Sequence, residues 1–123
     1  MIEKKYNILV VDDSIINQKL AKALLEKINQ NVYIAEDGFK ALEICKKENI
    51  DIIFMDIHMP NLDGIQASKK IREELKLNMP IIAMTGDEAN EHLDEWQRSG
   101  INEFLEKPYN LDKISDIIKK FSN

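Results

Sequence analysis

The 123-residue sequence has one cysteine, one tryptophan, four glycines and three prolines. A single cysteine cannot close an internal disulfide, and the apolar helical pattern around Cys45 predicts a core residue rather than a nucleophile. No apolar run approaches the roughly 18 residues of a membrane span, and residues 1–5 lead into a strand pattern rather than a signal peptide. We therefore expect a cytoplasmic protein without a membrane anchor.

Basic residues are also few relative to acidic ones. The chain carries 17 lysines and arginines against 22 acidic residues, a net charge of −5. Because a phosphate backbone requires clustered positive charge, this balance argues against direct nucleic-acid binding. With 44% hydrophobic and 32% charged residues, the composition is that of a globular protein. We expect residues 1–123 to form one domain, large enough to bury a core without disulfides.

Strand and helix patterns alternate five times along the chain. Short apolar or β-branched runs predict strands at residues 7–11, 32–35, 51–55, 81–85 and 102–105. Apolar residues at helical spacing mark five helices, of which the fourth is expected to be a shorter one, and the first is capped by Ser14 or Asp13. These marking residues are Ile16, Leu20, Leu24 and Ile28; Ala41, Leu42 and Cys45; Ile65, Ser68, Ile71 and Leu75; Ala89, Leu93 and Trp96; and Leu111, Ile114, Ile118 and Phe121. Five consecutive βα units predict a doubly wound α/β fold with helices on both faces of a parallel sheet.

Four of the predicted strands end at polar residues. Asp12 and Asp13 follow the first strand, Asp56 the third and Lys107 the fifth, while Thr85 closes the fourth. Parallel strands bring their carboxyl ends to one edge of the sheet, where open α/β sheets bind ligands. We therefore expect these five side chains to form one site.

The residue types at this edge predict phosphoryl chemistry. Three carboxylates a few ångströms apart repel one another unless a cation intervenes, and oxygen ligands favour Mg²⁺, or Mn²⁺ in its place. A carboxylate beside such an ion can attack a phosphoryl group to give an aspartyl phosphate. The ammonium of Lys107 and the hydroxyl of Thr85 are suited to bind the phosphoryl oxygens. Taken singly, an Asp-Asp pair is usually a solvated loop and a Lys-Pro pair a surface turn, so the prediction rests on their conjunction.

The same residues carry a resemblance to a known family. The segments that carry it are Val10-Val11-Asp12-Asp13-Ser14, residues 55–64 (MDIHMPNLDG), Met84-Thr85-Gly86 and Lys107-Pro108. From residue 8 to about residue 121, the chain resembles a response-regulator receiver domain of two-component phosphorelays. The resemblance implies a flavodoxin-like sheet of five parallel strands in the order 2-1-3-4-5, with five helices. It fits both a stand-alone regulator and a receiver cut from a hybrid histidine kinase.

The resemblance also implies roles for individual residues. Asp56 would be phosphorylated by a histidine kinase or a histidine phosphotransfer protein. Asp13 and Asp56 would bind Mg²⁺ directly, Asp12 through water, and the backbone carbonyl of His58 would be a further ligand. The peptide bond between Lys107 and Pro108 would be cis. A stand-alone regulator of this kind would be no enzyme beyond its own phosphorylation and dephosphorylation.

Three positions near the site depart from the commonest family pattern or tune its behaviour. Phe104 stands where the family has an aromatic switch residue; a shift of Thr85 toward the phosphoryl group would open space for it, and ordinary core packing is the other interpretation. His58 and Asp87 would flank the phosphoryl group. Our hypothesis is that Asp87 orients water while His58 responds to pH; both could instead point to solvent. His92 has no predicted role.

The partners are predicted in outline only. In the family, the first helix docks the phosphodonor through an apolar patch, which here would have Ile15 at its centre, with Asn17 as a further docking residue beside exposed Lys19 and Lys22. The output surface would be formed by the fourth helix, fifth strand and fifth helix. The sequence gives no indication of the stimulus, the output protein or the oligomeric state.

Three other protein classes share features with this pattern. A haloacid-dehalogenase-like phosphatase would need a second aspartate at the position of His58. A flavodoxin-like electron carrier would need a phosphate-binding loop after the first strand, where Asp12 and Asp13 would repel the phosphate. An interaction module that is never phosphorylated remains the alternative.

Overall fold

The computed structural model describes residues 2, 4–86 and 89–122, apart from the side chains of residues 89–91 and 93. In this part of the chain, five strands alternate with five helices: β1 Asn7–Val11, α1 Ile15–Lys27, β2 Asn31–Ala35, α2 Gly38–Lys47, β3 Ile52–Asp56, α3 Gly64–Glu73, β4 Ile81–Thr85, α4 Ala89–Arg98, β5 Glu103–Glu106 and α5 Leu111–Phe121. The strands form one parallel sheet in the order β2-β1-β3-β4-β5, which confirms the predicted fold.

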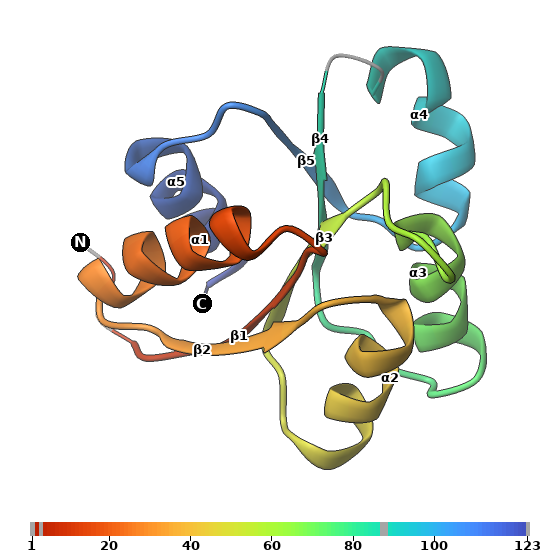
Figure 1. Cartoon of the computed structure of the whole chain (residues 1–123), viewed down its shortest axis with the longest axis horizontal. Coiled ribbons are helices and arrows are strands. Elements are labelled where there is room, and N and C mark those ends of the chain that lie inside the picture. The colour runs from red at the N-terminus through yellow and green to blue at the C-terminus, as the bar shows by residue number, and fades with distance from the viewer. Residues whose placement is uncertain (1, 3, 87–88, 123) are drawn as a thin grey trace.

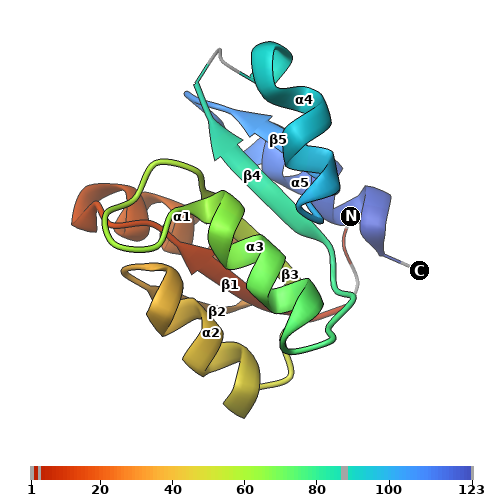
Figure 2. The same cartoon turned by 90° about the vertical axis from the view of Figure 1, so that its right-hand side faces the viewer.

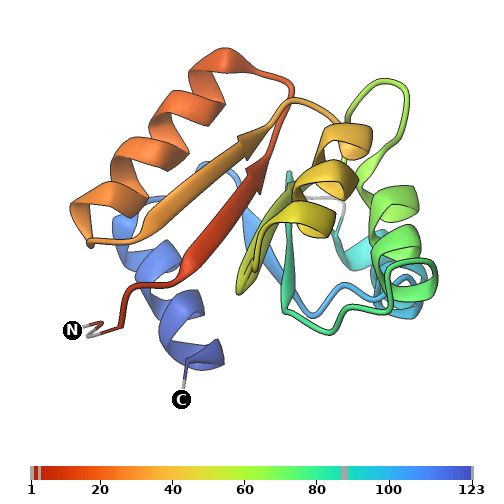
Figure 3. The same cartoon turned by 90° about the horizontal axis from the view of Figure 1, so that it is seen from below.

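The helices cover the two faces of this sheet. Helices α1 and α5 lie together on one face, and α2, α3 and α4 lie on the other (Figure 1). Figure 2 shows α3 and α4 in front of the strands, and Figure 3 shows the sheet between the two helical layers. Strands β3 and β4 are buried at every position, as expected for central strands covered on both faces.

Alternation along each strand divides the core into two layers. Ile8 and Val10 of β1 pack with α1 and α5, whereas Leu9 and Val11 pack with the helices of the other face. Cys45 belongs to the second layer, and its burial raises the pKa of the thiol to about 11. The thiol therefore stays protonated at neutral pH, which confirms Cys45 as a core residue.

Side-chain caps fix the start of four helices near the carboxyl edge of the sheet. Ser14, Asp37, Asp63 and Asn110 are the N-caps of α1, α2, α3 and α5, and each accepts a hydrogen bond from the backbone N–H three residues on. Of the two predicted caps for α1, Ser14 is the one used. Since each cap ends a loop that leads from a strand to the next helix, the caps also hold the loops that carry the site.

The predicted apolar face of α1 is wrong in its first two turns. Ile16 is 78% exposed and Leu20 is 46% exposed, whereas Ala21 and Leu25 are the buried residues of this helix. Ala21 and Leu25 pack in the core layer against the sheet, and this packing turns Ile16 and Leu20 toward solvent. Helix α4, expected to be short, has 10 residues, fewer than α1 and α5 and as many as α2 and α3, and its backbone is non-helical at His92.

Gly64 allows α3 to start against the end of β3. A Cβ atom on Gly64 would lie 2.4 Å from the backbone oxygen of Asp56, and a backbone atom cannot move aside at low cost. We expect Gly64→Ala to lower the free energy of unfolding by about 1–3 kcal/mol, the usual cost of overpacking. Urea denaturation measures this, with Gln66→Ala on the exposed side of the same helix as the control. A loss of less than about 0.5 kcal/mol, the range of neutral surface changes, would contradict the close approach.

Candidate functional site

Three aspartates gather at the carboxyl edge of the sheet, as the strand ends predicted. Asp12 and Asp13 follow β1, and Asp56 is the last residue of β3. One carboxylate oxygen from each lies within 4.8 Å of the others. Asp12 is fully buried and Asp56 is 5% exposed, whereas Asp13 is exposed to solvent. The site is therefore an acidic cluster that is closed on the protein side and open on one side to water.

Asp12 is held by its neighbours in the loop between β1 and α1. Its N–H donates to the carbonyl oxygen of Ala35, its Oδ1 accepts from the N–H of Ser14 at 2.9 Å, and its carbonyl oxygen accepts from Gln18 Nε2 at 2.7 Å. The other carboxylate oxygen, Oδ2, is buried and has no hydrogen-bonding partner among the described residues. A buried carboxylate oxygen without a hydrogen-bonding partner can bind a cation, or a water molecule that a cation coordinates.

Burial and neighbouring groups shift the pKa of the Asp56 carboxyl group in both directions. Burial raises the pKa of its carboxyl group, the positive charge of Lys107 lowers it, the charge of Asp12 raises it, and a hydrogen bond from the N–H of His58 lowers it; the net pKa is raised. The His58 nitrogen lies 3.2 Å from Asp56 Oδ1, and Lys107 Nζ lies 3.5 Å from the same oxygen. A raised pKa shows that one nearby ammonium does not compensate for burial beside other carboxylates.

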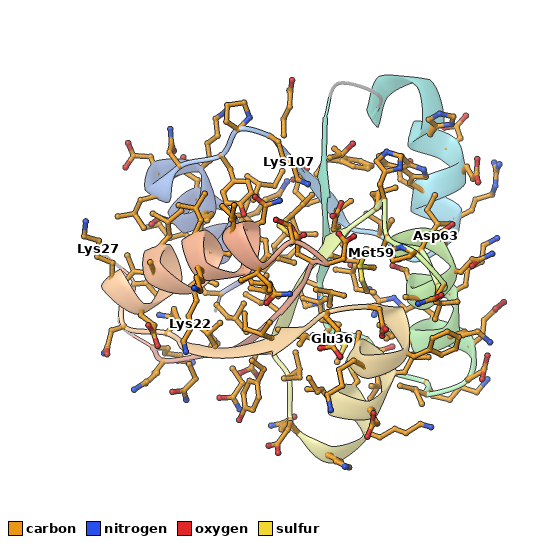
Figure 4. The ribbon with its side chains drawn as sticks, in the orientation of Figure 1. Lys22, Lys27, Glu36, Met59, Asp63 and Lys107 are labelled. Carbon is orange, nitrogen blue, oxygen red and sulfur yellow. The ribbon has the colours of Figure 1, made fainter. Side chains whose placement is uncertain are left out.

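Thr85 and Lys107 complete the predicted set. Thr85 ends β4, is 1% exposed, and its Oγ1 has no hydrogen-bonding partner among the described residues. The N–H of Lys107 donates to the carbonyl oxygen of Thr85 at 2.7 Å, so the two residues are tied together through the backbone. The Lys107–Pro108 peptide bond is cis, as predicted. In Figure 4, Lys107 lies in the loop after β5, in the region between α5 and α4.

The donor set fits a hard divalent cation. All three clustered ligands are carboxylate oxygens, one of which is buried without a partner, and the cluster is open to water on the Asp13 side. Mg²⁺ prefers oxygen ligands and keeps several waters, which this half-open arrangement permits. The acidic triad could therefore bind a metal ion.

The residues predicted to tune the site lie toward α4. Phe104 is half-buried, and its ring lies 5.6 Å from that of Trp96, which in turn stacks on exposed His92 at 5.7 Å. A hollow of about 510 Å³ lies next to these rings; the residues lining it are Ile57, His58, Met59, Asp63, Ile65, His92, Glu95 and Trp96. It contains none of the three clustered aspartates, so it borders the acidic site without being part of it. The prediction for Asp87 lies outside the described residues.

The predicted docking position on α1 is solvent-exposed. Ile15 is 65% exposed, and the Asn17 N–H donates to the Ser14 cap. Ile16 and Leu20 of the same helix are exposed as well, which adds two apolar side chains to the patch predicted around Ile15. The helical pattern concealed the rest of the patch, because Ile16 and Leu20 were assigned to its core positions.

One residue at this edge was missed by the sequence analysis. Tyr109, directly after the Lys107–Pro108 pair, has a buried hydroxyl without a hydrogen-bonding partner among the described residues. Burial raises the pKa of this phenol, and the charges of Asp12 and Asp56 raise it further. The sequence signal that could have identified Tyr109 is its position directly after the Lys107-Pro108 motif. An aromatic residue at that position, however, predicts only core packing.

One family model and a curated relative match nearly the whole chain. The family model described as "response regulator receiver domain" matches residues 8–119. The osmosensing histidine protein kinase SLN1 of Saccharomyces cerevisiae is 36% identical over 97% of this chain, and the match covers 10% of that protein. The chain thus spans about a tenth of this curated relative.

Two solved structures are similar over nearly the whole chain. The receiver domain of the sensor histidine kinase PA1611 from Pseudomonas aeruginosa, with a magnesium ion coordinated in its active-site cleft, has a TM-score of 0.85 and 29% identity over 96% of this chain and 98% of that one. The complex of the S. cerevisiae histidine phosphotransfer protein Ypd1 with the receiver domain of Ssk1 gives a TM-score of 0.90 and 32% identity over 98% of this chain and 91% of the matched chain. None of the helices in the described part of this chain is long and apolar enough to cross a membrane.

Proposed function

Because the chain belongs to the response regulator receiver domain family of two-component signalling, we propose that its Asp56 accepts a phosphoryl group from a phosphohistidine donor. The observation that carries the proposal is the acidic cluster, with oxygens within 4.8 Å of one another, together with Lys107 Nζ 3.5 Å from Asp56 Oδ1. The clustered aspartates and Lys107 come from the ends of three different strands. Burying the carboxylates of Asp12 and Asp56 side by side is unfavourable for the fold, so a binding function explains their placement better than a structural one.

The reaction requires an attacking oxygen and partners for the transferred charge. A carboxylate oxygen of Asp56 would bond to phosphorus while the bond from phosphorus to the donor's imidazole nitrogen breaks, and that nitrogen keeps the electron pair. Lys107 would bind one phosphoryl oxygen. The unpartnered hydroxyl of Thr85 would donate to another. Positioning and charge stabilisation of this kind are most of what phosphoryl transfer requires of a protein.

We assign the metal site to the same residues. Asp13 and Asp56 would hold Mg²⁺ directly, Asp12 would hold it through water, and the backbone carbonyl of His58 would be a further ligand; Mn²⁺ would bind in the same way. The bound ion would neutralise the cluster and the incoming phosphoryl charge. The magnesium ion in the P. aeruginosa receiver domain supports this assignment.

Phosphorylation would be read out on the α4–β5–α5 face. When Thr85 and Lys107 turn toward the phosphoryl group, the end of β4 and the start of α4 would shift, and Phe104 would follow Thr85. The tilted contact between Phe104 and Trp96 supports a link to α4.

In this scheme, Asp87 and the His58 side chain control the access of hydrolytic water. Alone, the domain would catalyse only its own phosphorylation and dephosphorylation; it would serve either as a regulator or within a hybrid kinase.

The phosphodonor would dock on the apolar patch of α1, formed by Ile15, Ile16 and Leu20. The patch lies at the start of the helix that follows Asp12 and Asp13, so a helix docked there could bring its phosphohistidine to the site. The complex of a similar receiver domain with Ypd1 supports a histidine phosphotransfer protein as the partner.

Ile15→Asp is expected to slow transfer from a phosphohistidine protein about tenfold or more, because it places a charge in an apolar contact. It should leave the reaction with acetyl phosphate unchanged, since that donor needs no docking surface. Phosphoryl transfer to the purified chain, followed by gel mobility, measures both rates. Lys27→Asp at the other end of α1 is the control. Equal slowing with both donors would show damage to the site and contradict the docking assignment.

Acetyl phosphate with Mg²⁺ tests the proposed function itself. The chain is expected to gain one phosphoryl group in the presence of Mg²⁺ and none when the ion is chelated, as read by intact-protein mass spectrometry. If neither acetyl phosphate nor a range of phosphohistidine proteins modifies the chain, the alternative holds: an interaction module that is never phosphorylated.

A further inference from the structure

Two segments of the chain enclose the hollow beside α4. Five of its lining residues lie between the end of β3 and the first turn of α3, and three lie on α4. Figure 2 shows α3 and α4 on the same face of the sheet, and Figure 4 shows Met59 and Asp63 in the region of the loop between β3 and α3. At about 510 Å³, the hollow is within the size range of ligand pockets.

The floor of the hollow is apolar. Ile57 is 4% exposed and Trp96 is 2% exposed, and both belong to the core layer on this face of the sheet. Met59 and Ile65 are half-buried and pack against the same layer. An occupant of the hollow would therefore contact apolar surface along part of its length.

The remaining charge in the hollow is negative. Asp63 and Glu95 contribute carboxylates, and no lysine or arginine is among the lining residues. Asp63 is held in place because its Oδ1 accepts a hydrogen bond from the N–H of Gln66 at 2.9 Å, whereas Glu95 is exposed on α4. Neither carboxylate forms an ion pair with another residue in the part of the chain that the structure describes. These carboxylates favour a cationic occupant over an anionic one.

A metal ion does not match this arrangement. Among the described residues, the cluster of Asp12, Asp13 and Asp56 is the one group of three or more potential ligands that could hold a metal ion, and it lies outside the hollow. The matching occupant is a cationic group on an apolar stem, which is the chemistry of an arginine or lysine side chain.

Arginine fits the α4 side of the hollow better than lysine. His92 and Glu95 lie three residues apart on α4 and both line the hollow. The ring of exposed His92 stacks on that of Trp96, with 5.7 Å between the ring centroids. A guanidinium group is planar, stacks on aromatic rings and pairs with carboxylates, whereas an ammonium group acts as a point charge.

We propose that this hollow binds an arginine side chain of the protein partner that reads the α4–β5–α5 face. The stem of the arginine lies on the apolar floor, and its guanidinium pairs with Glu95 in the field of Asp63. The ring of Trp96 lies 5.6 Å from that of Phe104 in β5, so the hollow is continuous with the proposed output face. The inference deepens the proposed function by naming the chemistry of the partner. Its test needs no phosphorylation, so the two proposals can fail separately.

Two peptides of the same shape test the role of the charge: acetyl-Leu-Arg-Leu-amide and its neutral counterpart acetyl-Leu-citrulline-Leu-amide. Trp96 is the one tryptophan of the chain, so its fluorescence reports binding in the hollow directly. The arginine peptide is expected to change this fluorescence saturably and to bind about tenfold more tightly than the citrulline peptide. Glu95→Gln should weaken binding of the arginine peptide about fivefold, the upper range for an exposed ion pair, and leave that of the citrulline peptide unchanged.

Asp94→Asn is the matched control, because it makes the same change in net charge at the neighbouring exposed position of α4, outside the hollow. It should leave the affinity for both peptides unchanged. Equal affinity for the two peptides would overturn the proposal, since the floor alone would then bind them. The proposal is also overturned if Asp94→Asn weakens binding as much as Glu95→Gln, or if the arginine peptide gives no saturable change up to about 10 mM, where even millimolar binding is detected.

Discussion

Asp56→Asn is expected to take up no phosphoryl group from any donor and to unfold at a higher urea concentration than the original chain when Mg²⁺ is absent. Asparagine has no carboxylate oxygen to attack phosphorus, so the loss of phosphorylation should be complete. The gain in stability has a separate cause. Two unit charges 4–5 Å apart repel by about 3–4 kcal/mol at an effective dielectric constant of 20, and the substitution removes this repulsion between Asp56 and Asp12.

The lost attraction to Lys107 offsets part of that gain, so we expect a net increase of about 1–2 kcal/mol in the free energy of unfolding. Asp63→Asn is the control: it makes the same charge change in the loop after β3, and asparagine still caps α3. Mass spectrometry after acetyl phosphate treatment and urea denaturation measure the two effects. Phosphorylated Asp56→Asn protein, or a stability below that of the original chain, would contradict this account of the site.

Asp13→Asn is expected to weaken Mg²⁺ binding about 100-fold or more, because it removes a direct ligand rather than a residue that orients one. Asp13 is exposed, so the fold should be unaffected without Mg²⁺. The metal-dependent rise in the thermal midpoint should therefore disappear at concentrations that saturate the original chain, and phosphorylation by acetyl phosphate should be lost with it.

The control for Asp13→Asn is Glu36→Gln. Glu36 is an exposed carboxylate at the end of β2 and lies outside the acidic cluster, and the substitution makes the same change in net charge (Figure 4). If both variants lose Mg²⁺ binding to the same extent, the ion responds only to the general negative charge of this edge. That result would remove Asp13 from the ligand set.

The sequence was sufficient to predict how the strand ends meet. An apolar run that stops at a polar residue indicates a buried parallel strand ending at the sheet edge, and this rule placed Asp12, Asp56 and Thr85 correctly. It works because side-chain alternation is a local property of each strand, and right-handed crossovers in successive βα units place the strands parallel in one sheet. The cis bond before Pro108 was predicted from the family motif rather than from such a rule.

The outward face of α1 and the buried hydroxyl of Tyr109 could not be predicted in the same way. Ile16 and Leu20 fit a helical stripe, but the rotation of the helix on the sheet selects Ala21 and Leu25 for burial instead. Only the packed structure decides between two such stripes. From the sequence, Tyr109 is indistinguishable from an ordinary core aromatic, because the burial of its hydroxyl depends on packing against residues far away in the sequence. Contacts of that range leave no local pattern.

The most direct test of the central claim is to locate the phosphoryl group. The chain is treated with acetyl phosphate and Mg²⁺, the acyl phosphate is reduced with borohydride, and the digested protein is sequenced by mass spectrometry. Reduction of an aspartyl phosphate breaks its acyl bond to the phosphate oxygen and leaves homoserine at that position. The account predicts homoserine at position 56 alone, and only when Mg²⁺ is present. Homoserine at Asp12, Asp13 or another aspartate, with Asp56 unchanged, would contradict it.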